Sequence, residues 1–207
     1  MPAKLDTQKQ AKFLVETLKP AIDKAKNGCL HLFFVDASHF VMGGVVGRLW
    51  CKVRLWVKTG SGRKRYNVLG ALNFVTKTIE SVTNDTYITS VQVVELLEKL
   101  AERYVGKPIA IVLDNASYQR CKLVTSKATE LGITLIFLPP YSPNLNLIER
   151  AWKFVKAEVL NAAYIDTFDE YRKRISAFID NIEIDNAHKM DSLVTENFQL
   201  FDKCKIA

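Results

Sequence analysis

The chain has 207 residues, of which 48% are hydrophobic and 25% are charged, and its net charge at pH 7 is +7. This composition is typical of a globular protein with one full hydrophobic core, and it argues against a disordered chain. No apolar run approaches the roughly eighteen residues of a membrane span, and the polar N-terminus does not resemble a signal peptide. The four cysteines are scattered without a CxxC pair, which favours free thiols. We therefore expect a cytoplasmic protein with no membrane partner.

The positive charge is concentrated in one segment. Residues 37–79 contain eight Lys or Arg and no acidic residue, so this segment carries +8 and the remaining residues together sum to −1. A local basic patch of this kind indicates a binding site for a polyanion, with nucleic acid as the first candidate. The alternative is a solvated surface whose lysine stems cover apolar neighbours. The basic residues selected as candidates for DNA contact are Arg48, Lys52, Arg54, Lys58, Arg63, Lys64 and Arg65.

The first part of the chain is predicted to contain one helix and several strands. Residues 5–26 have apolar positions at helical spacing, and Pro20 is expected to kink or split that helix. The apolar run "CLHLFFVDA" indicates a buried strand that ends at Asp36. Residues 48–58 alternate with period two, which predicts a half-buried antiparallel strand, and residues 66–82 supply further strands.

Helices and strands alternate in the second part of the chain. The predicted order is helix 90–104, strand 109–114, helix 117–131, strand 133–138, a proline-rich loop with a helix carrying Glu149, and a last helix that starts at the capping box of Thr167. This order predicts an α/β fold, in which a mixed sheet has helices on its faces. Residues 1–27 are expected to form an N-terminal helical extension and residues 28–207 a single domain.

Three acidic residues stand out as candidates for chemistry. Asp36 and Asp114 each end a buried-type strand, and Glu149 follows the segment "PPYSPNLNLI". Sites in such sheets form at the carboxyl ends of the strands. Carboxylates that converge there repel one another unless cations bind between them, and oxygen ligands of this kind suit Mg²⁺ or Mn²⁺. Two such ions, about 3.5–4 Å apart, can hold a phosphodiester for displacement at phosphorus.

Each of these acids also has an ordinary structural explanation. An aspartate at the end of a strand is often a turn former or a helix N-cap. Glu149 could pair with Lys153 one helical turn later, and it lies three residues after Asn146, which is the spacing of a capping box. Composition and periodicity alone leave these alternatives open.

A family resemblance favours the chemical interpretation. The segments "FFVDASHF", "IVLDNASYQ" and "LPPYSPNLNLIERAWKFVK" resemble the three signature blocks of the mariner-type DDE transposases, in particular their bacterial insertion-sequence branch. The third block is the most specific, because "PPYSPxLNxIE" is a hallmark of the family. Asp114 and Glu149 are separated by 34 residues, the spacing that marks this variant of the superfamily. The similarity extends from about residue 28 to at least residue 160.

The resemblance implies a ribonuclease H-like fold, with a mixed five-stranded sheet and helices on both faces, for a catalytic domain over residues 28–207. It implies two Mg²⁺ or Mn²⁺ ions bound by a catalytic triad, in which Asp36 bridges both ions while Asp114 and Glu149 each complete one. Water would then hydrolyse DNA at the transposon ends, and the liberated 3′-OH would attack target DNA, with TA targets favoured. Its partners would be DNA and a second copy of the chain in a synaptic homodimer, at the nucleoid.

Four further residues are candidates for supporting roles. His39 could touch phosphate or a metal-bound water, although a structural histidine explains it as well. Asn115 could orient Asp114 or contact DNA, and it also suits a plain turn. Tyr141 and Asn146 offer hydrogen-bonding groups beside the site, and their first role is expected to be loop geometry.

The sequence offers two other interpretations. "FFVDAS" begins like the nucleophile strand of a haloacid dehalogenase-type phosphatase, but that chemistry needs a second acid at the position of Ser38. The remaining alternative is a non-catalytic DNA-binding or assembly module that retains the fold. Family members carry N-terminal helix-turn-helix modules, and none fits into the 27 residues before the first strand. We therefore expect a catalytic fragment, a split-frame product or a relic, with the helix-turn-helix region encoded separately.

Overall fold

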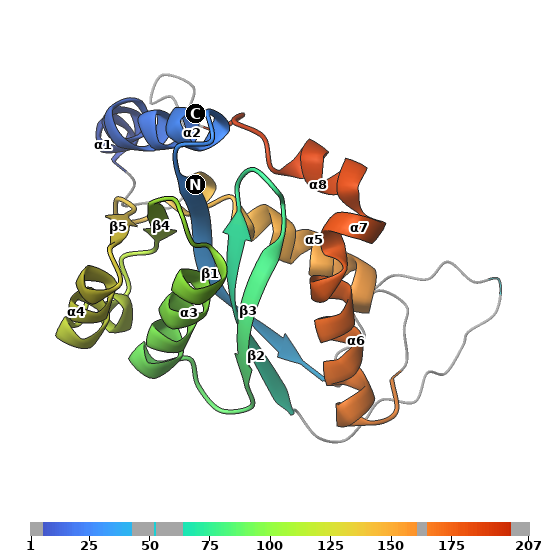
Figure 1. Ribbon diagram of the computed structural model, residues 1–207. Helices are drawn as coiled ribbons and strands as arrows, with labels where there is room; N and C mark the ends of the chain where they lie inside the picture. The colour runs from blue at the N-terminus through green and yellow to red at the C-terminus, as the bar shows by residue number, and fades with distance from the viewer. Residues whose placement is uncertain (1–5, 43–51, 53–63, 161–164, 200–207) are drawn as a thin grey trace.

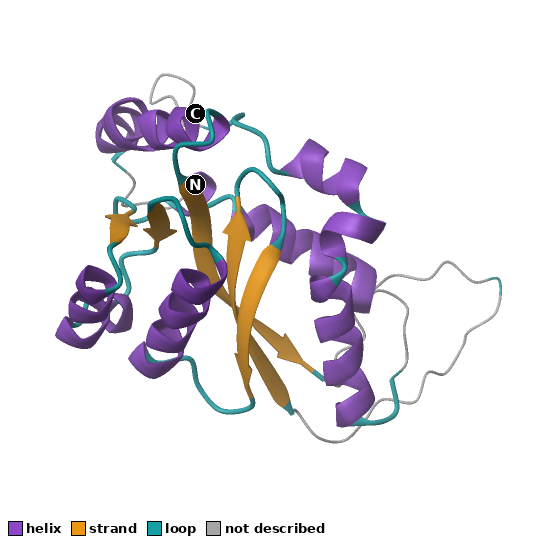
Figure 2. Cartoon of the chain, in the orientation of Figure 1, coloured by secondary structure: helices purple, strands orange, loops and turns teal. Residues whose placement is uncertain are grey.

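A mixed five-stranded sheet forms the centre of the protein (Figures 1 and 2), as predicted. The computed structural model describes residues 6–42, 52, 64–160 and 165–199. The predicted strand over residues 48–58 therefore lies outside the described residues, except for Lys52. The same holds for the DNA-contact candidates Arg48, Arg54, Lys58 and Arg63.

The sheet has the strand order β3-β2-β1-β4-β5. Its strands are β1 (His31–Val41), β2 (Arg65–Asn73), β3 (Ile79–Asn84), β4 (Ile109–Leu113) and β5 (Ile133–Phe137). The first three strands pair antiparallel, whereas β4 and β5 run parallel to β1. A tight turn joins β2 to β3, in which the side chain of Asn73 accepts hydrogen bonds from the backbone N–H groups of Val75 and Thr76.

Strand β1 continues beyond Asp36, where the sequence predicted its end. Its parallel pairing with β4 stops at Val35 opposite Leu113, but its antiparallel pairing with β2 continues as far as Val41 opposite Arg65. The antiparallel partner keeps the strand extended through a stretch that is too polar to be recognised as buried. Asp36 therefore lies in mid-strand, at the level where β4 ends.

The helices cover both faces of the sheet (Figure 1). The α-helices of the described residues are α1 (Thr7–Phe13), α2 (Lys19–Lys26), α3 (Ser90–Arg103), α4 (Lys122–Glu130), α5 (Ile148–Leu160), α6 (Phe168–Asp180), α7 (Ile182–Asp185) and α8 (Ala187–Leu193). A π-helical segment over Leu14–Leu18 joins α1 to α2 directly before Pro20. The predicted helix over 117–131 is a 3₁₀ turn, Ser117–Gln119, followed by α4. None of the described helices combines the length and apolarity that a bilayer crossing requires.

Alternate residues of β1 contribute to two separate hydrophobic clusters. Phe33 and Val35 face α3 and α4, whereas Phe34 and Phe40 face the other side, which α2, α5 and α6 cover. This alternation follows from the two-residue period of a strand. It also fixes the direction of Asp36, which must point towards the face that carries α5.

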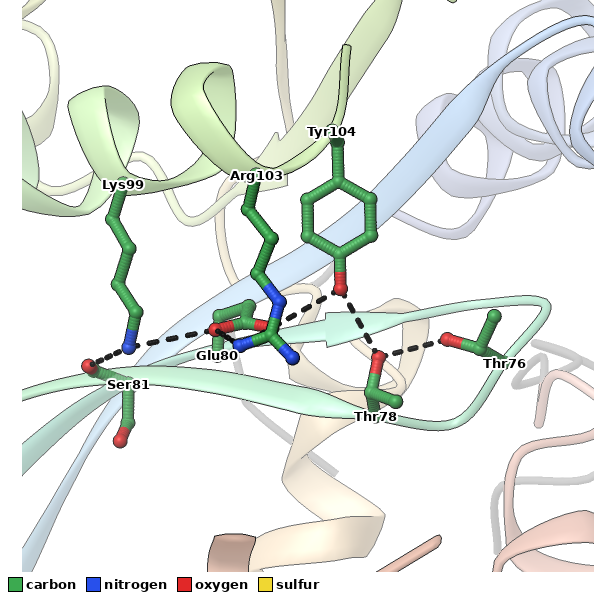
Figure 3. A network of polar contacts seen from close by, with 7 residues as sticks. All are labelled: Thr76, Thr78, Glu80, Ser81, Lys99, Arg103 and Tyr104. Carbon is green, nitrogen blue, oxygen red and sulfur yellow. Dashed lines mark hydrogen bonds and ion pairs between the residues drawn. The ribbon is translucent and has the colours of Figure 1, made fainter.

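A buried carboxylate joins the edge strand β3 to α3 (Figure 3). Glu80 is only 4% exposed. It accepts a hydrogen bond from the hydroxyl of Tyr104 at 3.1 Å and forms ion pairs with Arg103 at 3.1 Å and Lys99 at 3.4 Å. The side chains of Lys99 and Arg103 are exposed, whereas that of Glu80 is buried. Removal of the Glu80 carboxylate is therefore the change in this network that affects buried groups.

We expect Glu80→Ala to lower the free energy of unfolding by roughly 1–3 kcal/mol, because the half-buried Tyr104 hydroxyl loses its shorter hydrogen bond and β3 loses its ion pairs with α3. Lys99→Ala is the matched control and should cost less than about 1 kcal/mol, as is usual for an exposed ion pair. Urea denaturation measures both. Equal losses for the two variants would contradict the central role of Glu80.

Candidate active site

Asp36 projects from β1 towards α5 and lies opposite Gly70 of β2. Burial, together with the nearby carboxylates of Glu149 and Asp114, raises the pKa of Asp36 to about 7, while the ammonium group of Lys156 acts in the opposite direction. Lys156 extends from α5 over the ring of Phe40, at 5.6 Å from its centroid. Asp36 is thus a partly buried acid that faces two other acids.

Asp114 follows the last residue of β4, and the side chain of Asn146 holds it in place. The amide nitrogen of Asn146 donates hydrogen bonds to Oδ1 of Asp114 at 3.2 Å and to the backbone carbonyl of Val35 at 3.1 Å. Burial raises the pKa of Asp114, and the hydrogen bond from Asn146 partly offsets this rise. Asn146 is 1% exposed. It therefore joins the segment before α5 to both strands that carry the aspartates, and its side chain does not cap the helix as its spacing suggested.

Glu149 lies in the first turn of α5. Its pKa is raised by burial and by the carboxylate of Asp114, and it is lowered by Lys153 and Lys156 on the same helix. The three acids thus lie within electrostatic range of one another, although they come from three distant segments. In the part of the chain that the structure describes, no three His, Cys, Asp or Glu side chains already form a metal cage.

The N-terminal helix holds the proline loop that precedes Glu149. The side-chain amide of Gln10 in α1 donates to the hydroxyl of Ser142 at 2.8 Å and to Oδ1 of Asn144 at 3.1 Å. Gln10 is 1% exposed. Asn144 in turn donates to the backbone carbonyl of Gln199 at 2.7 Å. The loop is thus fixed by contacts that sequence reasoning did not predict, since the residues that make them are 132 positions apart.

Helix α5 sits on the sheet through a close contact between Trp152 and the backbone of β2. A Cβ atom at Gly70 would lie 2.6 Å from Cζ2 and 2.8 Å from Cη2 of the Trp152 indole. Gly70 is the residue opposite Asp36. The missing side chain at this position lets the indole lie beside Asp36, which places Glu149, one turn earlier on α5, near the same carboxylate.

Arg150 anchors α5 to the C-terminal segment. Its guanidinium donates to the backbone carbonyls of Leu193, Thr195 and Asn197 at 3.0, 3.1 and 2.6 Å. The guanidinium also lies 5.9 Å from the ring centroid of Phe198. These contacts tie α5 to the C-terminal segment, and nothing in the local sequence predicted them.

Residues 31–172 match the family of DDE superfamily endonucleases. The chain belongs to the DDE superfamily. No curated protein matches the sequence.

Several solved structures resemble this DDE-superfamily chain. The Mos1 transposase paired-end complex with left transposon end has a TM-score of 0.64 and 11% identity over 96% of this chain and 66% of that one. A pre-cleavage Mos1 transpososome has a TM-score of 0.63 and 11% identity over 98% of this chain and 66% of that one. The simian T-cell lymphotropic virus intasome, in complex with PP2A regulatory subunit B56 gamma, has a TM-score of 0.53 and 14% identity over 86% of this chain and 59% of that one. The chain spans less than two thirds of these proteins. At such identities they show the fold, which is ribonuclease H-like.

The predicted supporting residues have different surroundings in the structure. His39 belongs to the opposite face of β1 from Asp36, and its Nδ1 forms a 2.6 Å hydrogen bond with Oδ1 of Asn67, which favours its structural role. Asn115 and Tyr141 line a pocket beside Asp114. Sequence reasoning missed Tyr118, whose phenol has its pKa raised by burial and by the carboxylates of Asp36 and Asp114.

Three of the predicted DNA-contact residues lie within the described part of the chain. Lys52, Lys64 and Arg65 are all exposed. Arg65 pairs with Val41 at the far end of β1, five residues beyond Asp36, or about 16 Å at roughly 3.3 Å per residue. Lys64 lies 5.5 Å from the ring centroid of Phe168. These two exposed cations therefore lie well away from the carboxylates.

We expect Gly70→Ala to destabilise the DDE-superfamily chain by about 1–3 kcal/mol, the usual cost of overpacking, and to displace α5. The decisive measurement is a double-mutant cycle with Trp152→Leu, read by urea denaturation. Because the smaller side chain vacates the space that the new methyl group needs, the Gly70→Ala loss should shrink in the Trp152→Leu background. Additive losses would show that the indole does not fill the space at Gly70.

The acids predict how stability depends on pH in the metal-free protein. The pKa of Asp36 is about 7 when folded, against an ordinary value of 3.8. The folded state therefore keeps a proton that the unfolded state loses, so the free energy of unfolding falls as the pH rises from about 4 to about 7. Asp36→Asn, which cannot ionise, should lose less stability between about pH 5 and pH 8 than the wild type. Urea melts in EDTA measure this, and identical pH profiles would contradict it.

Proposed function

We propose that this chain is the catalytic domain of a DDE transposase of the bacterial insertion-sequence branch. In this proposal it cuts DNA at transposon ends and joins the liberated 3′-OH to target DNA. The observation that carries the proposal is the meeting of Asp36, Asp114 and Glu149 on one side of the sheet, where burial and mutual repulsion raise the pKa of Asp36 and Glu149. Membership of the DDE superfamily supports it.

The donor set of this site fits divalent cations. Three carboxylates that burial and their neighbours make costly to ionise are stabilised as anions when a cation lies between them, and oxygen donors suit Mg²⁺ or Mn²⁺. In this proposal Asp36, Asp114 and Glu149 hold two such ions. When bound, the ions would activate the attacking oxygen and stabilise the leaving oxygen of a phosphodiester.

The other residues around the site have roles that follow from their contacts. Asn146 fixes the orientation of Asp114 and leaves its second oxygen available. Lys153 and Lys156 already lower the pKa of Glu149, and the same positive charges would attract the phosphates of DNA towards the carboxylates. The close contact of Trp152 with Gly70 sets how near α5 lies to β2.

DNA is the proposed partner, both as transposon end and as target. The exposed Lys64 and Arg65 would contact its backbone without reading bases. We also propose a synaptic homodimer, since two transposon ends must be handled together and symmetric pairing is the common solution. Sequence-specific recognition of the ends is assigned to a separately encoded helix-turn-helix region, and the proposed location is the nucleoid.

The competing proposal is a DNA-binding or assembly module that has kept the fold without the chemistry. The absence of a ready-made metal cage among the described residues is the observation in its favour. It predicts that DNA binds equally well to the wild type and to variants of the three acids, and that no variant changes any cutting activity.

Cleavage of DNA that carries the cognate terminal repeats, with Mg²⁺ or Mn²⁺, tests the proposal. We expect Glu149→Gln to reduce cutting by more than about 100-fold, as expected when a group that stabilises transition-state charge is lost, while DNA binding is retained. Glu158→Gln, an exposed acid on the same helix, is the matched control and should cut normally. Wild type that cuts no better than Glu149→Gln, at equal binding, would leave only the non-catalytic module.

Metal binding can be measured without DNA. Mn²⁺ should raise the melting temperature of the wild type, because an ion that binds only the folded state stabilises it. The same additions should have little effect on Asp36→Asn or Asp114→Asn and a full effect on Glu158→Gln. A wild-type melting temperature that does not respond to Mn²⁺ would contradict the assigned metal ligands.

A further inference from the structure

The segment over residues 193–199, which we call the C-terminal strap, is held mainly through its backbone carbonyls. Side chains of other elements donate hydrogen bonds to the carbonyls of Leu193, Val194, Thr195, Asn197 and Gln199. The donors are Arg150 of α5, Lys77 of the β2–β3 turn and Asn144 before α5. The strap is thus attached to the helix that carries Glu149.

The strap has little regular structure of its own. Residues 195–199 belong to neither a helix nor a strand, and the side chains of Glu196, Asn197 and Gln199 are exposed. An internal backbone hydrogen bond joins the N–H of Phe198 to the carbonyl of Glu196 at 2.8 Å. Segments with exposed side chains and few internal bonds open locally at a lower free energy than the core beneath them. The strap can therefore detach while the sheet and its helices stay folded.

Arg150 makes the largest share of the contacts that hold the strap. Its guanidinium donates to three strap carbonyls, at 2.6 to 3.1 Å. Burial lowers the pKa of Arg150, and the ion pairs of the described residues do not include it. The strap carbonyls therefore take the place of water and of an acid around this charge. Detachment of the strap leaves the guanidinium without these acceptors, so the side chain must move to find others.

The first turn of α5 depends on support from outside the helix. The N–H groups of Glu149 and Arg150 bond to carbonyls only three residues earlier, at 3.2 and 3.1 Å. Such 3₁₀-type bonds have poorer geometry, and helix ends fray. Asn146 does not cap the turn, and its Oδ1 has no partner among the described residues. Because Glu149 and Arg150 are consecutive in this turn, a change in its winding moves both side chains.

We propose that docking of the C-terminal strap completes the metal site, with Arg150 as the positioning residue that transmits the state of the strap to Glu149. The inference rests on the proposed function, since it assumes that Glu149 binds a divalent ion. It adds that the strap and the ion are coupled in both directions. A docked strap tightens ion binding, and a bound ion holds the strap in place, because coupling between two sites is reciprocal.

Calorimetric titration of the metal-free protein with Mn²⁺ tests the coupling without DNA. Arg150→Met keeps much of the side-chain length but removes all its donors, so it should weaken Mn²⁺ binding at least about fivefold, the lower end of usual coupling between sites. In a Glu149→Gln background the same change should alter the remaining Mn²⁺ affinity less than about twofold. Unchanged affinity in Arg150→Met, or equal losses in both backgrounds, would overturn the proposal, since a general structural role does not depend on Glu149.

Two further variants support the assignment. Arg150→Lys keeps the charge but cannot reach three carbonyls at once, so it should lose part of the affinity, again only when Glu149 is present. Arg172→Met is the matched control. Arg172 is a half-buried arginine that ties α6 to Asp85 after β3, and its loss should leave Mn²⁺ affinity unchanged. A loss in Arg172→Met as large as that in Arg150→Met would contradict a specific role for Arg150.

Proteolysis measures the opposite direction of the coupling. A glutamate-specific protease cuts after Glu196 only when the strap is detached, so the rate of this cut reports the detached fraction. Mn²⁺ should slow the cut at least about fivefold in the wild type and not in Glu149→Gln. An unstructured glutamate peptide in the same digest corrects for any effect of Mn²⁺ on the protease. A rate that does not respond to Mn²⁺ in the wild type would overturn the proposal.

The outcome is separable from that of the proposed function. If the wild type binds Mn²⁺ and cuts DNA while Arg150→Met binds Mn²⁺ equally well, the strap inference fails and the enzyme assignment stands. If Mn²⁺ binding and strap detachment are coupled through Glu149 but the wild type never cuts DNA, the strap inference stands and the transposase assignment fails.

Discussion

The placement of Glu149 depends on the contact between the Trp152 indole and the bare backbone of Gly70. Any side chain at Gly70 would lie within 3 Å of that ring, so glycine is the residue that lets α5 approach the sheet so closely. Gly70 is also the partner of Asp36 across the β1–β2 ladder. One packing contact therefore determines both how close α5 comes and which carboxylate it approaches.

That close approach has an electrostatic cost. Three partly buried acids repel one another, and the pKa of Asp36 is raised first by burial and then by this repulsion. The surrounding structure must oppose it with contacts that do not depend on the acids themselves. Asn146 ties the loop before α5 to β1, Gln10 fixes the proline loop from the N-terminal helix, and Arg150 binds the C-terminal segment. Local frustration at the acids and rigid support around them are the expected combination at a functional site.

Much of this arrangement could be predicted from local sequence. Apolar runs located β4 and β5, the capping box of Thr167 located the start of α6, and an acid at the end of each buried run singled out Asp36 and Asp114 as candidates. The rest depends on contacts between distant segments. The extension of β1 to Val41 is decided by its pairing with β2, and the hydrogen bonds of Gln10 and Asn146 join residues more than a hundred positions apart. A sequence pattern within one helix or strand contains no information about such distant partners.

The two ends of the proline loop have different roles, and a stiff backbone keeps them in register. At its start, Pro139, Pro140 and Tyr141 form a wall of the pocket beside Asp114, and just beyond its end Asn146 holds the Asp114 carboxylate. A flexible loop would let these two places move independently. Because the prolines restrict the backbone between them, the pocket wall and the residue that orients Asp114 are held in a fixed relation by one short segment.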